Sequence, residues 1–104
     1  MSAPRRVQRT RTRGGGMPEG AVYVGRPTRW GNPYRVGDPD PMAPGHTLTA
    51  ETAVRMYAWY LESRDELRAE ARRELAGRDL ACWCKPGAPC HADELMRRAN
   101  ETVR

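Results

Sequence analysis

All three cysteines of the chain lie in one short stretch, RDLACWCKPGAPCHADEL, which spans residues 78–95. Cys82, Cys84 and Cys90 are accompanied there by His91, which directly follows Cys90. A tetrahedral set of three cysteines with a histidine or a water suits Zn²⁺. The spacing C-x-C-x₅-C-H therefore predicts a metal site, with zinc as the metal and iron or an iron–sulfur centre as the alternative. A thiol-based active site and merely buried cysteines are the competing interpretations.

The expected local geometry restricts how these residues share one ion. Cβ atoms two residues apart on a strand are separated by roughly 6.6 Å, so the strand must bend at Trp83 if Cys82 and Cys84 are both ligands. Cys90 is placed at a predicted helix start, where free N–H groups lower the pKa of a thiol. Side chains of Cys90 and His91 diverge by about 100° at a helix start. Both reach one ion only if the backbone there is irregular.

The role of His91 decides what the metal does. If His91 is not a ligand, the fourth position is open, and a bound water is acidified toward neutral pH and becomes a nucleophile. His91, Asp93 and Glu94 are then the candidate proton carriers. If His91 is a ligand, the site has four protein ligands and serves as a staple.

A second dense motif, GRPTRWGNPY, spans residues 25–34. Arg26 and Arg29 carry forked donors that suit a phosphate or a carboxylate. Trp30 is suited to stacking on a base, and Asn32 to reading hydrogen-bonding edges. The alternative is structural: Trp30 fills the core, and Asn32 makes a turn with the proline that follows it.

These motifs sit in a chain with little material for a core. One hundred and four residues allow one domain, and the chain has no Phe, no Ile, and only 12 Leu and Val residues in all. Three Trp and four Tyr compensate in part, since each offers roughly 150–250 Å² of buriable surface. A core this thin is expected to need a staple, which the metal would supply.

Composition also bounds compartment and partners. An odd number of cysteines excludes a complete internal disulfide set, and no apolar run has the length of a signal peptide or membrane span. We therefore expect a cytoplasmic protein with no membrane contact. The net charge is +5 and five arginines precede the first acidic residue, which favours a nucleotide or nucleic acid as partner, unless these arginines only solvate a tail.

The apolar patterns predict a small α/β domain. Residues 21–25 are typical of a strand, and Thr49 is expected to cap a helix whose stripe is Val54, Tyr57, Ala58 and Leu61. SRDE at 63–66 indicates a capping box for a second helix, which Gly77 ends. Residues 79–84 are predicted to form a buried strand, and a last helix to begin near Cys90 with Val103 on its apolar face. By composition, residues 5–20 indicate a flexible arm with a glycine hinge at 14–16.

GRPTRWGNPY, RVQRTRTRGGGMPEGAVYVG and LAGRDLACWCKPGAPCHADELMRRAN together resemble the small bacterial and phage family catalogued as domain of unknown function 4326. The resemblance implies a compact α/β unit in which RVQR is a first strand, so that residues 1–4 are a disordered N-terminus and 5–104 a single domain. It also implies that the site residues are Arg26, Trp30, Asn32, Cys82, Cys84, Cys90, His91 and Asp93. The occurrence of the family in phages associates it with nucleotide or nucleic-acid metabolism.

The sequence thus predicts a short sheet packed with about three helices and stapled by a zinc site. The favoured function is that of a zinc-dependent hydrolase or transferase acting on a nucleotide, modified base or related phosphate-bearing substrate. The alternative is a zinc-stapled, non-catalytic module that binds nucleic acid or a host protein. The predicted residues are Cys82, Cys84, Cys90 and His91 for the metal; Arg26, Arg29, Trp30 and Asn32 for the substrate; and His91, Asp93 and Asn32 for catalysis.

Overall fold

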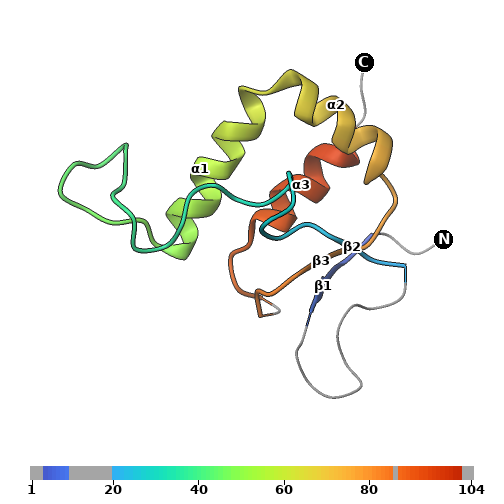
Figure 1. Ribbon diagram of the computed structural model, residues 1–104, viewed down its shortest axis with the longest axis horizontal. Helices are drawn as coiled ribbons and strands as arrows, with labels where there is room; N and C mark the ends of the chain where they lie inside the picture. Colours follow the sequence, from blue (N-terminus) through green and yellow to red (C-terminus); the bar gives the residue numbers. More distant parts are fainter. Residues whose placement is uncertain (1–3, 10–19, 86, 102–104) are drawn as a thin grey trace.

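The computed structural model describes residues 4–9, 20–85 and 87–101. Along the chain come strands β1 (Arg6–Gln8) and β2 (Val22–Tyr23), helices α1 (Ala50–Glu62) and α2 (Asp65–Glu74), strand β3 (Leu80–Cys82) and helix α3 (His91–Ala99) (Figure 1). This confirms the predicted small α/β domain. Of the predicted disordered N-terminus, residues 1–3 lie outside the described residues, as do the glycines 14–16 and Val103.

The three strands form one parallel sheet in the order β1-β3-β2. Leu80 pairs with Arg6 on one side and with Val22 on the other, so β3 is the central strand. Because both of its edges are paired, β3 carries a continuous buried run of Leu80, Ala81 and Cys82. The strand ends at Cys82, and the chain bends at Trp83, as a shared ion would require.

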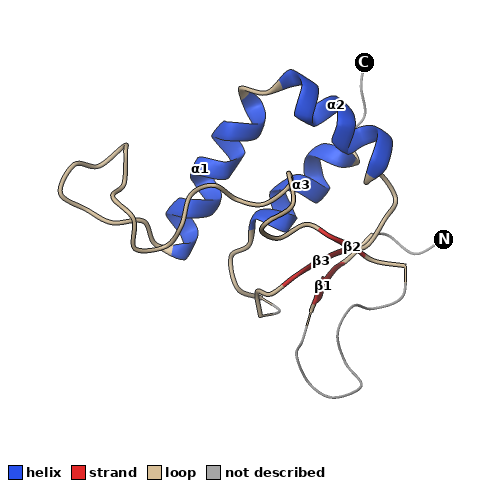
Figure 2. Ribbon diagram, viewed as in Figure 1, coloured by secondary structure: helices blue, strands red, loops and turns tan. Residues whose placement is uncertain are grey.

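Helix α3 lies between the sheet and the other two helices. It contacts β1 and β3 on one side and α1 and α2 on the other. Figure 2 shows the helices gathered to one side of the strands. The buried residues of α3 include Ala92, Leu95 and Ala99, as its predicted apolar face requires. Since α3 begins at His91 with Cys90 as its N-cap, this packing fixes where the last cysteine and the histidine lie.

The first helix confirms its predicted cap and corrects its predicted face. Thr49 caps α1 by accepting from the backbone N–H of Thr52, in a capping box. The fully buried residues are Ala53, Met56, Tyr57 and Leu61, whereas Val54 and Ala58 are only half-buried. Met56 and Ala53 face a small second core with Leu48, and this contact turns the helix away from the predicted stripe.

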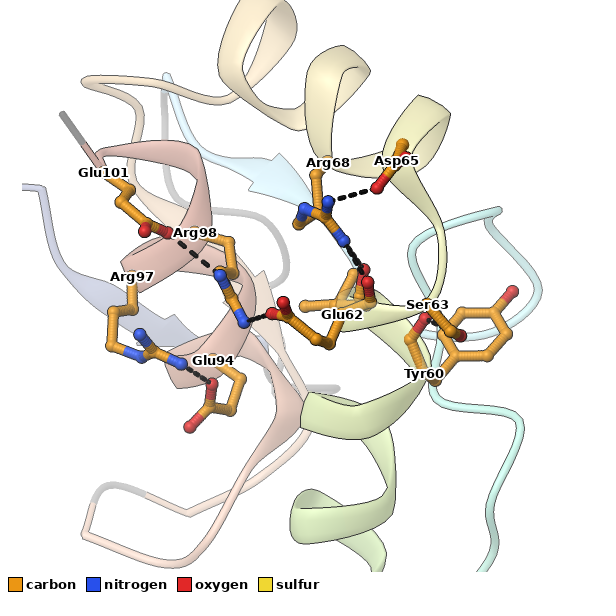
Figure 3. A network of polar contacts seen from close by, with 10 residues as sticks. Tyr60, Glu62, Ser63, Asp65, Arg68, Glu94, Arg97, Arg98 and Glu101 are labelled. Carbon is orange, nitrogen blue, oxygen red and sulfur yellow. Dashed lines mark hydrogen bonds and ion pairs between the residues drawn. The ribbon is translucent and has the colours of Figure 1, made fainter. Parts of the chain in front are cut away.

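The predicted capping box at residues 63–66 is wrong. Helix α2 begins at Asp65 after Arg64, which makes no side-chain cap, because Ser63 is used as the C-cap of α1 and donates its hydroxyl to the carbonyl of Tyr60. Arg68 closes the same corner by donating to the carbonyls of Leu61 and Glu62 (Figure 3). Gly77 has the predicted left-handed conformation, with a φ of 75°, but it lies in the turn after α2, which ends at Glu74 with Leu75 as its C-cap.

An ion pair between α3 and α1, flanked by two pairs along α3, joins these helices over the thin core. Arg98 on α3 pairs with Glu62 at the end of α1 and with Glu101, while Arg97 pairs with Glu94 (Figure 3). The Arg98 side chain is largely buried. None of the helices in the described ranges has the length and apolar character needed to cross a membrane.

Candidate metal centre

The sulfur atoms of Cys82, Cys84 and Cys90 form one group, in which all Sγ atoms lie within 4.8 Å of one another. Cys82 ends the central strand, Cys84 follows the bend, and Cys90 precedes α3. We call these three residues the cysteine cluster. Cys82 and Cys90 are buried, Cys84 is half-buried, and all three are free thiols. The predicted convergence of the three sulfurs is therefore confirmed.

The spacing of these sulfurs suits a metal ion. A tetrahedral zinc site with Zn–S bonds of about 2.3 Å places its sulfurs about 3.8 Å apart. In the cysteine cluster the Sγ atoms of Cys82 and Cys90 are 3.2 Å apart, and no pair exceeds 4.8 Å. Small side-chain rotations would bring the three sulfurs to ligand distance, so they are able to hold a metal ion.

The protons of the metal-free cluster are distributed unevenly. Cys90 donates its S–H to the sulfur of Cys82, and this bond, with further help from the N–H of Cys84 and the charge of Arg6, lowers the pKa of Cys82 to about 6. The same donated bond, with burial, raises the pKa of Cys90. Burial raises the pKa of Cys84. The N–H of Ala92 at the helix start does lower the pKa of Cys90 as predicted, but the bond to Cys82 outweighs it.

This distribution predicts how many protons leave when a metal binds. A pH of about 7.5 lies above the pKa of Cys82, so Cys82 is already a thiolate, whereas Cys84 and Cys90 are still protonated. Because bound cysteines are thiolates, metal uptake should release about two protons per ion. At roughly pH 5, below the pKa of Cys82, the number should rise to about three. A pH indicator in weakly buffered solution measures it, and release of about three protons at the higher pH would contradict the assignment.

His91 lies beside the cysteine cluster in a fixed orientation. Its Nε2 lies 2.8 Å from the carbonyl of Val24, which can only accept, so Nε2 carries the proton. Burial lowers the pKa of His91 and keeps the ring neutral, which leaves a lone pair on Nδ1. That Nδ1 lies 3.8 Å from Cys90 Sγ. The ring also packs edge-on against Tyr57. Ligation by His91 stays a prediction.

A cavity of about 170 Å³ brings the two sequence motifs together. It lies where the strands end, because Cys82 closes β3 and Val24 follows β2, and ligands of open parallel sheets bind at this edge. Two residues of the cysteine cluster, Cys82 and Cys84, thus line the same space as residues of the GRPTRWGNPY loop. Its lining residues are Tyr23, Gly25, Arg26, Asn32, Cys82, Trp83, Cys84 and His91.

A family model described as "Domain of unknown function (DUF4326)" matches residues 7–101, which include both motifs. The chain belongs to the DUF4326 family. No curated protein and no solved structure matches it. The resemblance noted in the sequence is thereby confirmed over nearly the whole chain.

Among the predicted substrate residues of this DUF4326 protein, only Arg26 and Asn32 line the cavity. Asn32 is nearly buried and donates to the carbonyl of Ala53, while its side-chain oxygen accepts from the N–H of Tyr34. Each end of the amide keeps one hydrogen-bonding position, since a primary amide has two donors and two lone pairs. A role in catalysis or substrate binding stays a prediction, and the structure gives this residue a positioning role in the loop.

Arg29 and Trp30 of the DUF4326 protein are engaged elsewhere. Arg29 pairs with Glu70 and Glu74 on α2, and its guanidinium lies over the Trp30 ring, 4.7 Å from the centroid. Trp30 is 5 % exposed and belongs to the main core cluster. Its carbonyl accepts from the hydroxyl of Tyr57. The structure shows a packing role for both, and their predicted substrate contacts stay predictions.

The predicted catalytic Asp93 stands outside the cavity lining, with a side chain 59 % exposed. Its carboxylate accepts from Arg6, whose side chain is only 10 % exposed. Arg6 also donates to the carbonyls of Lys85 and Ala88, at 3.0 and 2.7 Å, and so holds the loop that joins Cys84 to Cys90. Sequence reasoning assigned Arg6 to a phosphate-attracting set and missed this role, because only the pairing of β1 with β3 brings it to the DUF4326 site.

Proposed function

We propose that this protein is a zinc-binding enzyme that acts on a nucleotide, a modified base or a related phosphate-bearing substrate. The observation that carries the proposal is the shared cavity: Cys82 and Cys84 of the cysteine cluster line the same space as Arg26 and Asn32. A staple needs no such space beside it. An enzyme does, because substrate and metal must meet there.

The residues divide into three roles under this proposal. Cys82, Cys84 and Cys90 hold the zinc, which when bound would acidify a water toward neutral pH. Arg26 and Asn32 orient the substrate from the loop wall. His91 is neutral, and its Nδ1 lone pair can take a proton. Three free thiols in one group favour a reducing compartment, and we place the protein in the cytoplasm.

One observation favours a second candidate, the zinc-stapled module that binds nucleic acid or a host protein. The Nε2–H of His91 is bound to the Val24 carbonyl, and Nδ1 lies 3.8 Å from Cys90 Sγ. A histidine that ligates a metal usually donates its other N–H in this way. If His91 rotates slightly and completes the tetrahedron, the metal has four protein ligands and no reactive position.

Cobalt substitution separates the two functions. Metal content is first measured by mass spectrometry, and the absorption of the cobalt form is then recorded with and without added anions. An enzyme should show three thiolate ligands and a spectrum that changes when an anion enters the fourth position. The His91→Ala variant should keep that spectrum.

If the cobalt spectrum of the wild type does not change with added anions but does change in the His91→Ala variant, the zinc-stapled binding module is the correct function. Absence of any bound metal would contradict both candidates, since each needs the ion.

A further inference from the structure

We propose that Arg26 is the oxyanion-binding residue of the cavity, and that the ligand group it binds is a single phosphate or carboxylate. This rests on the proposed function, in which substrate and metal meet in that space. Arg26 is the one Lys or Arg residue among the described residues that line this cavity; the others are one Gly, one Asn, two aromatic residues, two Cys and His91. Within the described ranges, no carboxylate lines the cavity.

The guanidinium of Arg26 is unpaired among the described residues. In the part of the chain that the structure describes, it has no hydrogen bond and no ion pair, and the side chain is exposed. Arg29, three residues along the same loop, is neutralised by two glutamates of α2. Of the two arginines predicted to hold an anion, Arg26 is therefore the one with free donors, and these donors have the fork geometry that binds oxyanions.

The loop is built to hold Arg26 in place. Its carbonyl accepts from the hydroxyl of Tyr23, at 2.7 Å, and that hydroxyl in turn accepts from the indole N–H of Trp83. Gly31 packs directly on the arginine, since an added Cβ would lie 2.9 Å from Arg26 Cγ and 3.1 Å from its Cα. Gly25 leaves room for Tyr23 in the same way, because a Cβ there would lie 2.5 Å from the Tyr23 hydroxyl. Gly31 is thus a positioning residue for Arg26.

The size of the cavity limits the ligand group. A volume of about 170 Å³ corresponds to about five or six waters at roughly 30 Å³ each. This space has room for one phosphate or carboxylate group, and the rest of a larger substrate would extend out of it.

Calorimetric titration of the metal-loaded protein tests the assignment. Inorganic phosphate, acetate and a nucleoside monophosphate are the probes, and Arg26→Gln should weaken binding of the tightest probe by about tenfold or more. Arg29→Gln removes the same charge from the same loop and should change affinity less than about twofold, because its charge is already paired. The tightest wild-type ligand identifies the source of the oxyanion.

Gly31→Ala provides the test of positioning. We expect a several-fold loss of anion affinity with metal content unchanged, measured at a temperature where the variant is folded, because the added Cβ would displace Arg26 and not the cysteine cluster. The melting temperature should also fall, since the Cβ would meet the Arg26 backbone. Equal losses of anion affinity in Arg26→Gln and Arg29→Gln would overturn the assignment, since they would indicate that the overall positive charge of the loop attracts the anion and not Arg26 in particular. So would wild-type protein that binds none of the probes.

The outcome for the metal is separate. If purified protein holds metal and binds no anion, the Arg26 assignment fails and the metal centre stands. If it holds no metal and still binds phosphate through Arg26, the proposed enzyme fails and the anion site stands.

Discussion

The Cys90→Ser variant should lose its bound metal and much of its thermal stability together. Cys90 is 2 % exposed and belongs both to the cysteine cluster and to the main core. A metal present at a thousandfold above its Kd adds about 4 kcal/mol to the free energy of unfolding. In a domain of about this size, each kcal/mol shifts Tm by roughly 4–8 °C. We therefore expect metal content to fall to background and Tm to fall by about 15 °C or more.

The chelator response provides the control for this prediction. Wild-type protein treated with a strong chelator should melt near the temperature of the Cys90→Ser variant, and the variant itself should not respond. This comparison separates loss of the ion from the cost of burying a serine hydroxyl. A variant that keeps stoichiometric metal would remove the claim that these sulfurs share one ion.

Replacing Arg6 by Gln should weaken metal binding by about 10–100-fold, the range typical of residues that hold ligands in place. The Arg6 guanidinium donates to two carbonyls of the loop between Cys84 and Cys90, and to the carboxylate of Asp93. Its charge also helps to lower the pKa of Cys82, and it opposes the burial that raises the pKa of Cys84. Three thiolates around a divalent ion leave a net charge of −1, and Arg6 is placed to balance it. Competition with a chromophoric chelator measures the affinity.

Arg5→Gln is the matched control. Arg5 is the neighbouring residue and carries the same charge, but its side chain is exposed, and it anchors to Asp79 through its backbone N–H. It should bind metal as the wild type does. Arg6→Lys keeps the positive charge but loses the forked N–H donors of the guanidinium, so we expect a metal affinity between those of the wild type and Arg6→Gln. Wild-type affinity in Arg6→Gln would show that the loop needs no such anchor.

The elements that carry the cysteines could be predicted because their causes are local. A cap, a turn or a strand depends on residues within a few positions of one another, as at Thr49, Gly77 and the run from Leu80 to Cys82. The failure at Ser63 has a local cause too. Two adjacent helices compete for that residue, and the end of α1 uses it before the start of α2 can.

From the amino-acid sequence alone came the two motifs, the small α/β class and the convergence of three thiols on one place. Only the tertiary structure decided that Arg6 reaches across the sheet to the loop around the cysteine cluster, that Trp30 lies in the core, and that Arg26 rather than Arg29 faces the shared cavity. The physical reason is distance along the chain. Arg6 and Lys85 are 79 residues apart, and no short-range spacing encodes a contact made by strand pairing and by helix packing at once.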